Sequence, residues 1–289
     1  LSLCANDIVG LQTYRDARNF LHTCEAFFPN ADVDYRQRAV TMNGHRTLVR
    51  PYPISVEVGE LRRMMVSGRV REYEAKLRPL LGEHTIVRVD RAEPSKNVLR
   101  GFMAFDLLLE RHPELADKLR FLVFLVPSRT HIRQYQRYME DINRLVERIN
   151  AKYSTEGSPI IRVFYENNYP QAIAGMKLYD VLLVNAVIDG MNLVAKEGPI
   201  VNGKDGVLVL SESVGAYEQL AEGALAVSPA DIDGTAKALY EALTMPAEER
   251  KRRAAILREI IEQNDLPAWV CQQMGDLDAL TEASAQAAS

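Results

Sequence analysis

The sequence has 289 residues, 47% hydrophobic content and a formal net charge of −4. This length is enough for one large core or two smaller ones, and the lack of a basic surplus argues against nucleic-acid binding. No apolar run approaches the ~18 residues of a membrane span, and no basic-then-apolar signal segment opens the chain. The three cysteines lack metal-ligand spacing, which favours a reduced cytoplasmic protein.

The first 84 residues predict short elements. Residues 7–13 (DIVGLQT) indicate a strand with its exit loop, and apolar positions at helical spacing in 14–28 predict a helix. Asn43-Gly44 within residues 39–50 is typical of a type I′ hairpin. The RPYPI stretch at 50–54 predicts a stiff linker, and the charged residues 57–81 predict one or two helices.

From residue 84 onward, strands and helices alternate regularly. The predicted strands are 85–89, 121–126, 160–165, 181–184, 207–210 and a short one at Val227. The predicted helices are 97–111, 131–152, 170–178, the segment after Met191, 214–222, 229–243, 246–263 and 267–280. Repeated strand–helix units imply an α/β fold with a Rossmann-like parallel sheet and helices on both faces. In such sheets, ligands bind at the carboxyl ends of the strands.

The segment 180–197 (DVLLVNAVIDGMNLVAKE) combines a buried strand, a turn and the start of a helix. The strand ends before a turn at Asp189-Gly190, and Asn192 can cap the helix that carries Glu197. Unpaired backbone N–H groups at such a helix start suit an anion such as a diphosphate. The alternative is a purely structural strand-turn-helix unit in which Glu197 lies on a solvated face.

Cations follow two of the other predicted strands. Arg91 and Lys96 lie in the loop after strand 85–89, and Arg129 follows strand 121–126. Because parallel strands end at one edge of a sheet, these side chains and the Asp189–Asn192 turn should converge and clamp a phosphate group. The alternative is that Arg91 pairs with Asp90 or Glu93 while Arg129 is solvated.

Other common signatures are absent or uninformative. The sequence has no dinucleotide glycine motif, Walker phosphate loop, HExxH, CxxC or GxSxG pattern. Trp269 is expected to anchor the last helix in a core. The histidines are scattered and are expected to serve surface or packing roles; they are His22, His45, His84, His112 and His131.

Five segments together resemble the trehalose-6-phosphate synthase family of retaining glycosyltransferases. They are VDRAEPSKN (89–97), VPSR (126–129), VIDGMNLVAKE (187–197), GVLVLSESVGA (206–216) and ALTMPAEER (242–250). The resemblance implies a GT-B fold of two Rossmann-like domains, of which this chain is the C-terminal part. Residues 1–50 would be the incomplete end of the N-terminal domain, 51–84 a connector with helices, and 85–289 the C-terminal nucleotide-sugar-binding domain.

The resemblance also implies an activity and site roles. The family transfers glucose from a nucleoside diphosphate glucose, UDP-glucose in the first instance, to glucose 6-phosphate, and no metal or other cofactor is implied. By this likeness Asp189 would contact the donor sugar. The implied donor-binding residues are Arg91 and Lys96 at the diphosphate, Arg129 on the nucleotide side, Met191, Asn192, Leu193 and Val194 through backbone groups, and Glu197 at the ribose.

Two departures from the family pattern leave alternatives open. Residues 93–97 read EPSKN where the family mostly has DYSKG. This version resembles a side branch, including validoxylamine A 7′-phosphate synthase, that couples cyclitols and favours a guanine nucleotide. A catalytically silent binding protein of the same fold is a further alternative. The other catalytic groups are expected in an N-terminal part that 1–50 does not contain. The chain alone is therefore expected to bind donor without turnover, and exposed Phe20 and Phe27 would favour self-association.

Overall fold

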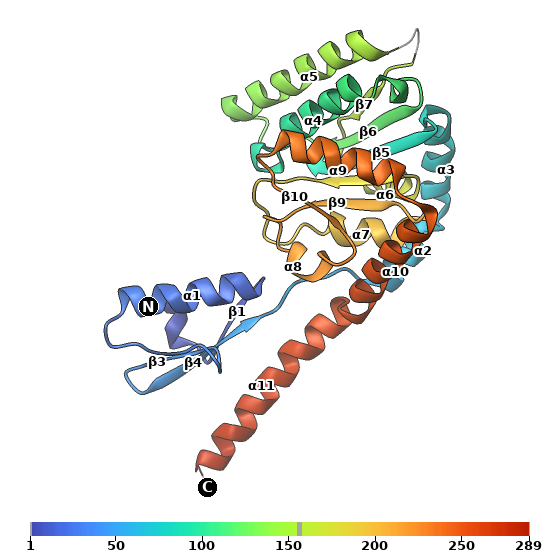
Figure 1. Ribbon diagram of the computed structural model, residues 1–289. Helices are drawn as coiled ribbons and strands as arrows, with labels where there is room; N and C mark the ends of the chain where they lie inside the picture. The colour runs from blue at the N-terminus through green and yellow to red at the C-terminus, as the bar shows by residue number, and fades with distance from the viewer. Residues whose placement is uncertain (1, 155–157, 289) are drawn as a thin grey trace. The chain divides into compact units, whose positions relative to one another are not determined.

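The computed structural model describes residues 2–154 and 158–288 (Figure 1). The chain divides into two compact units, Leu1–Ser55 with Gln263–Ser289, and Val56–Glu262. We call them the N-terminal unit and the sheet unit, and each is described by itself. This division differs from the sequence-based one, because residues 56–84 belong with the large sheet and the last segment of the chain belongs with the first.

The N-terminal unit is a small mixed sheet with one helix packed on it. Its sheet has the strand order β1-β4-β3-β2, with β1 parallel to β4 and the other pairs antiparallel. Leu21 and Cys24 of the helix share a core with Val40 and Val49 of the sheet. The elements are η1 (Ser2–Ala5), β1 (Ile8–Leu11), α1 (Tyr14–Phe27), β2 (Asp32–Asp34), β3 (Ala39–Met42), β4 (His45–Pro51) and α11 (Leu266–Ala288).

One local prediction for this unit is confirmed and another is confirmed in part. The β3–β4 hairpin turns at Asn43 and Gly44, whose φ angles of 51° and 81° are those a type I′ turn requires. Trp269 is half-buried rather than part of a core, but it does anchor α11, because its Nε1 donates to the backbone oxygen of Tyr52 at 2.9 Å. The Tyr52 hydroxyl in turn donates to Asp276 of α11 at 2.7 Å.

The sheet unit contains six parallel strands in the order β10-β9-β8-β5-β6-β7. The predicted strands and helices are all present, with shifts of a few residues at their ends. The elements are α2 (Val58–Met65), α3 (Gly68–Leu77), η2 (Arg78–Leu80), β5 (His84–Arg91), η3 (Pro94–Lys96), α4 (Val98–Arg111), η4 (Pro113–Leu115), β6 (Leu119–Val126), α5 (Arg133–Tyr153), β7 (Ile161–Phe164), α6 (Tyr169–Lys177), β8 (Val181–Val184), α7 (Val194–Val201), β9 (Val207–Ser211), α8 (Tyr217–Leu220), β10 (Leu225–Val227), α9 (Ile232–Thr244) and α10 (Ala247–Gln263).

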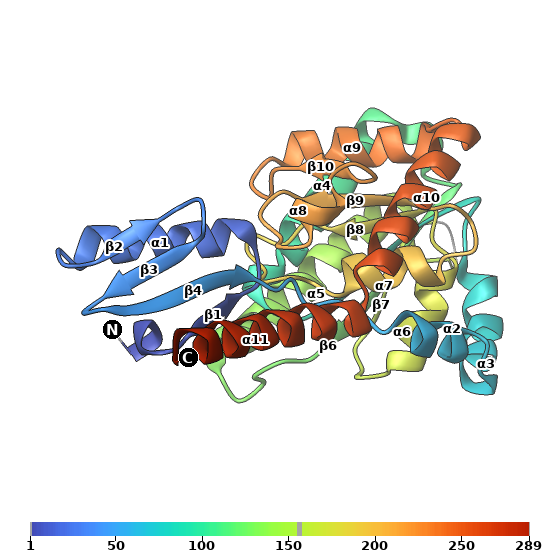
Figure 2. The same cartoon turned by 90° about the horizontal axis from the view of Figure 1, so that it is seen from below.

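Helices cover both faces of this sheet, as the alternating pattern predicts. Helices α4, α5 and α9 pack together on one face, and α2, α3, α6 and α7 pack together on the other (Figures 1 and 2). Phe102 and Phe105 of α4 meet Phe121 of β6, with ring centroids 5.5 and 5.2 Å apart. On the opposite face, Gly198 of α7 brings that helix close to Leu182.

Helices α2 and α3 show why residues 56–84 join the sheet unit rather than forming a connector. Their apolar side chains, including Leu61 and Leu77, are buried. Lys177 of α6 donates to the backbone oxygen of Met65 at 3.0 Å and pairs with Glu74 at 2.6 Å.

Within the described residues, no helix is both long and apolar enough to cross a membrane.

Candidate functional site

The site is built at the carboxyl ends of β5, β6 and β8, which lie side by side in the sheet. The loop after β5 carries Lys96, and the loop after β8 carries Asp189. Backbone contacts hold these two loops together, because the N–H of Val187 donates to the oxygen of Ser95 at 2.8 Å. The side-chain amide of Asn97 adds a second tie, donating to the oxygen of Asn185 at 2.9 Å.

Lys96 lies between two carboxylates at this edge. Its Nζ is 2.6 Å from Asp189 Oδ2 and 3.3 Å from Asp90 Oδ1. Burial alone would lower the pKa of Lys96, but the two carboxylates outweigh it and the pKa is raised. Lys96 is therefore a fixed positive charge that the protein itself partly neutralises.

Arg88 and Asp90 contact Lys96 and hold it in position. Arg88 is fully buried, and its Nε lies 2.9 Å from Asp90 Oδ2. It also donates from Nη1 to Asn185 Oδ1 at 2.7 Å and from Nη2 to the backbone oxygen of Lys96. Gly101 of α4 leaves the room for this guanidinium, because a Cβ there would lie 2.6 Å from Arg88 Nη1. One buried cation thus joins the β5 and β8 loops.

Sequence reasoning assigned no role to Arg88 or Asn185. The available signal was the arginine itself, which interrupts the apolar strand TIVRVD at a position on the same face as Ile86 and Asp90. A charge at such a position is rarely buried without a partner. The partner could not be read, because Asn185 is 97 residues away along the chain.

Arg91 and Arg129 lie at the same edge of the sheet but are engaged differently. Arg91 pairs with Glu93 Oε1 at 2.9 Å, which is the alternative considered for it, and Ser128 Oγ donates to the same oxygen at 2.7 Å. The Arg91 side chain is 57% exposed. Arg129 is exposed and turns onto Tyr135 of its own segment, donating to its hydroxyl at 2.6 Å. Neither arginine contacts Lys96 in this arrangement.

The start of α7 completes the edge. Asn192 adopts the left-handed backbone region with φ 66°, donates to Asp189 Oδ2 at 3.0 Å and accepts from the N–H of Ala195 at 3.3 Å. Met191 is buried, and its backbone oxygen accepts from Ala216. The N–H groups of Leu193 and Val194, at the first turn of α7, have no acceptor within the described part of the chain. They are the donors that a bound anion would use.

Glu197 lies one turn further along α7, at partly buried depth rather than on a solvated face. Burial raises its pKa, and a hydrogen bond from the Tyr169 hydroxyl, 2.8 Å away, acts in the opposite direction. The Glu197 carboxylate is partly buried and the Tyr169 side chain is exposed, so a ligand with hydroxyl groups could reach both. Among the described residues, no group of three or more His, Cys, Asp or Glu side chains is arranged to hold a metal ion.

Comparison with known proteins identifies the family of this chain. The sequence model of glycosyltransferase family 20 matches residues 1–279. The chain belongs to glycosyltransferase family 20. It is 34% identical over 271 residues to the bifunctional trehalose-6-phosphate synthase/phosphatase of Thermoproteus tenax, covering 92% of this chain and 36% of that protein. It is also 34% identical over 280 residues to the trehalose-6-phosphate synthase of Sodalis glossinidius, covering 95% of this chain and 58% of the relative.

Solved structures agree with the fold. The alpha,alpha-trehalose 6-phosphate synthase of Burkholderia multivorans superposes with a TM-score of 0.92 at 30% identity, over 99% of this chain and 61% of that one. A Burkholderia xenovorans trehalose-phosphate synthase in complex with glucose-6-phosphate gives 0.86 at 31% identity, over 96% and 62%. The predicted GT-B, Rossmann-like architecture is confirmed. The family 20 chain described here spans between a third and two thirds of the length of these relatives.

Proposed function

We propose that this chain forms the donor-binding part of a retaining glycosyltransferase. The donor is a nucleoside diphosphate glucose, UDP-glucose in the first instance, and the acceptor is glucose 6-phosphate. The observation that carries the proposal is Lys96, held by buried Arg88 and Asp90 beside the first turn of α7. A structure of the trehalose-6-phosphate protein from E. coli bound with UDP-2-fluoro glucose, 30% identical with a TM-score of 0.86, supports the choice of donor.

The chemistry follows from where negative charge develops. As the bond between the sugar's anomeric carbon and the diphosphate breaks, the leaving oxygen gains charge. Lys96 and the free N–H groups at the start of α7 stabilise that charge, and Arg91 joins them by exchanging Glu93 for a phosphate oxygen. Because Lys96 and Arg91 exchange their carboxylate partners when the donor binds, these charges are in position before the bond to the diphosphate breaks.

Asp189 has two tasks in this proposal. Without ligand, it neutralises Lys96 at 2.6 Å. When a diphosphate takes over the lysine, the Asp189 carboxylate is released to accept hydrogen bonds from the hydroxyls of the transferred sugar. Asn192, bonded to the same carboxylate oxygen at 3.0 Å, keeps it near the sugar position.

The remaining proposed contacts place the nucleoside. The backbone groups of Met191, Asn192, Leu193 and Val194 would meet the sugar and the phosphates, and Glu197 would accept from the ribose diol in competition with Tyr169. Arg129, released from Tyr135, would approach the nucleotide side. We propose that cations and helix-end amides do the work of a metal, so that EDTA leaves donor binding unchanged.

Isothermal titration calorimetry with UDP, GDP and ADP tests the proposal. We expect UDP to bind, and Lys96→Ala to weaken it at least about tenfold, or ~1.4 kcal/mol. The matched control is Lys76→Ala, because Lys76 is an exposed lysine on α3 whose contacts, with Glu72 and the Tyr73 ring, are with side chains of its own helix. Loss of UDP binding in Lys96→Ala but not in Lys76→Ala would place the diphosphate at this edge.

Other outcomes separate the alternatives. Absence of binding by all three nucleotides at concentrations above several millimolar would overturn the proposal. A clear preference for GDP would favour the cyclitol-coupling branch suggested by residues 93–97. Equal nucleotide affinity in the wild type and Lys96→Ala would favour the alternative of a catalytically silent binding protein of the same fold.

A further inference from the structure

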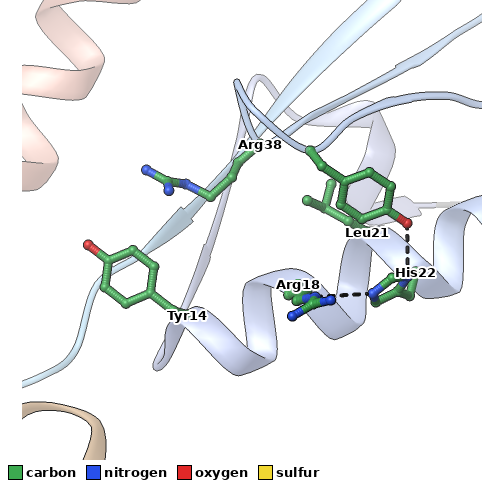
Figure 3. A pocket seen from close by; sticks show the side chains of 6 residues that line it. Tyr14, Arg18, Leu21, His22 and Arg38 are labelled. Carbon is green, nitrogen blue, oxygen red and sulfur yellow. Dashed lines mark hydrogen bonds between the residues drawn. The ribbon is translucent and has the colours of Figure 1, made fainter.

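A pocket lies in the N-terminal unit, lined by α1 and the turn between β2 and β3. It is a pocket of about 430 Å³, within the range of small-molecule sites. Figure 3 shows it from close by, with Arg18 and His22 next to each other on the helix and Arg38 on the opposite turn, its guanidinium on the side of Tyr14. Its lining residues are Tyr14, Arg18, Leu21, His22, Tyr35 and Arg38.

Helix geometry and a strained turn bring these residues together. Four of the lining residues recur at spacings of three and four along α1, so they share one face of the helix. The other two come from the turn between β2 and β3. Asp34 Oδ1 organises that turn by accepting from the N–H groups of Arg36 and Gln37, each at 2.9 Å. Arg38 follows with φ 49°, a left-handed conformation uncommon for a side chain of its size.

A chain of hydrogen bonds fixes the floor of the pocket. Arg18 Nε donates to His22 Nε2 at 3.3 Å, and His22 Nδ1 lies 2.9 Å from the Tyr35 hydroxyl. Because a guanidinium can only donate, the neutral His22 ring carries its proton on Nδ1 and donates to Tyr35. Tyr35 then donates to Glu25 Oε2 at 2.7 Å. The nearby carboxylate of Glu25 therefore accepts a hydrogen bond from Tyr35 and is not paired with an arginine of the pocket.

The two arginines of the pocket are left without anionic partners. Neither Arg18 nor Arg38 has a carboxylate within ion-pair distance among the residues that the structure describes. Arg38 Nε is buried and makes no hydrogen bond, while its guanidinium carbon lies 5.4 Å from the centre of the Tyr14 ring. The cavity therefore holds two cations that no carboxylate neutralises in the described part of the chain, an arrangement that suits an anion.

We propose that this pocket binds a small organic phosphate monoester that carries a ring. Two guanidinium groups match the charge and fork geometry of a phosphate. The Tyr14 and Tyr35 rings and the buried Leu21 side chain offer apolar faces for a sugar or nucleoside ring. This site is built by α1 and one turn, shares no residue with the proposed donor site, and does not depend on the proposed function.

The test measures binding of glucose 6-phosphate and of AMP to the whole chain, with glucose and inorganic phosphate for comparison. We expect at least one phosphate ester to bind more tightly than either comparison compound. Arg38→Gln should weaken that binding at least about tenfold. Arg36→Gln is the matched control, because it makes the same charge change two residues away on an exposed side chain outside the lining. UDP binding should be unchanged in Arg38→Gln.

A protection experiment on the unmutated protein keeps the test valid if a variant misfolds. Phenylglyoxal modifies accessible arginines, and peptide mass spectrometry reports each site. We expect the bound ester to slow modification of Arg18 and Arg38 severalfold while Arg36 reacts at an unchanged rate. Equal modification rates with and without ester, or equal affinities of Arg38→Gln and Arg36→Gln, would overturn the proposal. The ester that binds identifies the source, a sugar phosphate or a nucleotide.

Discussion

Gly101→Ala probes the buried arginine that organises the proposed donor site. Inside a helix this exchange normally stabilises by about 1 kcal/mol. Here the added Cβ would lie 2.6 Å from Arg88 Nη1 and 3.4 Å from Asn185 Oδ1, and Arg88 is completely buried. Overpacking of this kind costs about 1–3 kcal/mol, so after the helix gain of about 1 kcal/mol we expect a net loss of up to about 2 kcal/mol, measured by urea unfolding followed by far-UV circular dichroism.

The same variant should also weaken UDP binding, because Arg88 Nη2 holds the backbone oxygen of Lys96. Gly68→Ala is the control, since Gly68 opens α3 and nothing lies within 4 Å of the position its Cβ would take. The control should be neutral or slightly stabilising. A Gly101→Ala protein as stable as the wild type, with unchanged UDP affinity, would refute the idea that the guanidinium is rigidly seated.

Three further outcomes are expected. Arg88→Met should cost about 3–5 kcal/mol in urea unfolding, because it leaves the buried Asp90 carboxylate without its closest cation; a loss below 1 kcal/mol would contradict this. Burial raises the pKa of Glu197, so ionisation of that group opposes folding above its ordinary value of ~4.3. Glu197→Gln should therefore be more stable than wild type at pH 7, with a gain that disappears as the pH falls to 4; a gain independent of pH would argue against it. Burial raises the pKa of Cys24 to about 11, whereas Cys271 is exposed. One thiol of three should react with Ellman's reagent in the native protein and all three after denaturation.

Local sequence signals predicted most of the fold, because each parallel strand is a short apolar run followed by an amphipathic helix. The turn at Asp189-Gly190 and the capping role of Asn192 were predicted in the same way, from residues a few positions apart. The boundaries between the two units could not be predicted from the sequence. The buried faces of α2 and α3 show that residues 56–84 belong to the sheet, but a helix pattern does not say which core it joins.

The same distinction between local signals and long-range contacts applies to the site. Lys96 and Asp189 were placed at one edge of the sheet by topology alone, and their contact at 2.6 Å agrees with that placement. Their assigned roles remain predictions. The residues that hold Lys96 in place could not be predicted, because their hydrogen bonds join residues far apart in the sequence, such as Arg88 and Asn185. The sequence also could not show that Tyr135 binds the Arg129 side chain, which a ligand would have to displace.

The central claim is that Lys96 and the first turn of α7 hold a diphosphate. The most direct measurement is a crystal structure of this chain with UDP. The account predicts a phosphate oxygen within about 4 Å of Lys96 Nζ, the Lys96–Asp189 contact lengthened, and the N–H groups of Leu193 and Val194 donating to the ligand. A diphosphate bound elsewhere, with Lys96 still paired to Asp189, would contradict it.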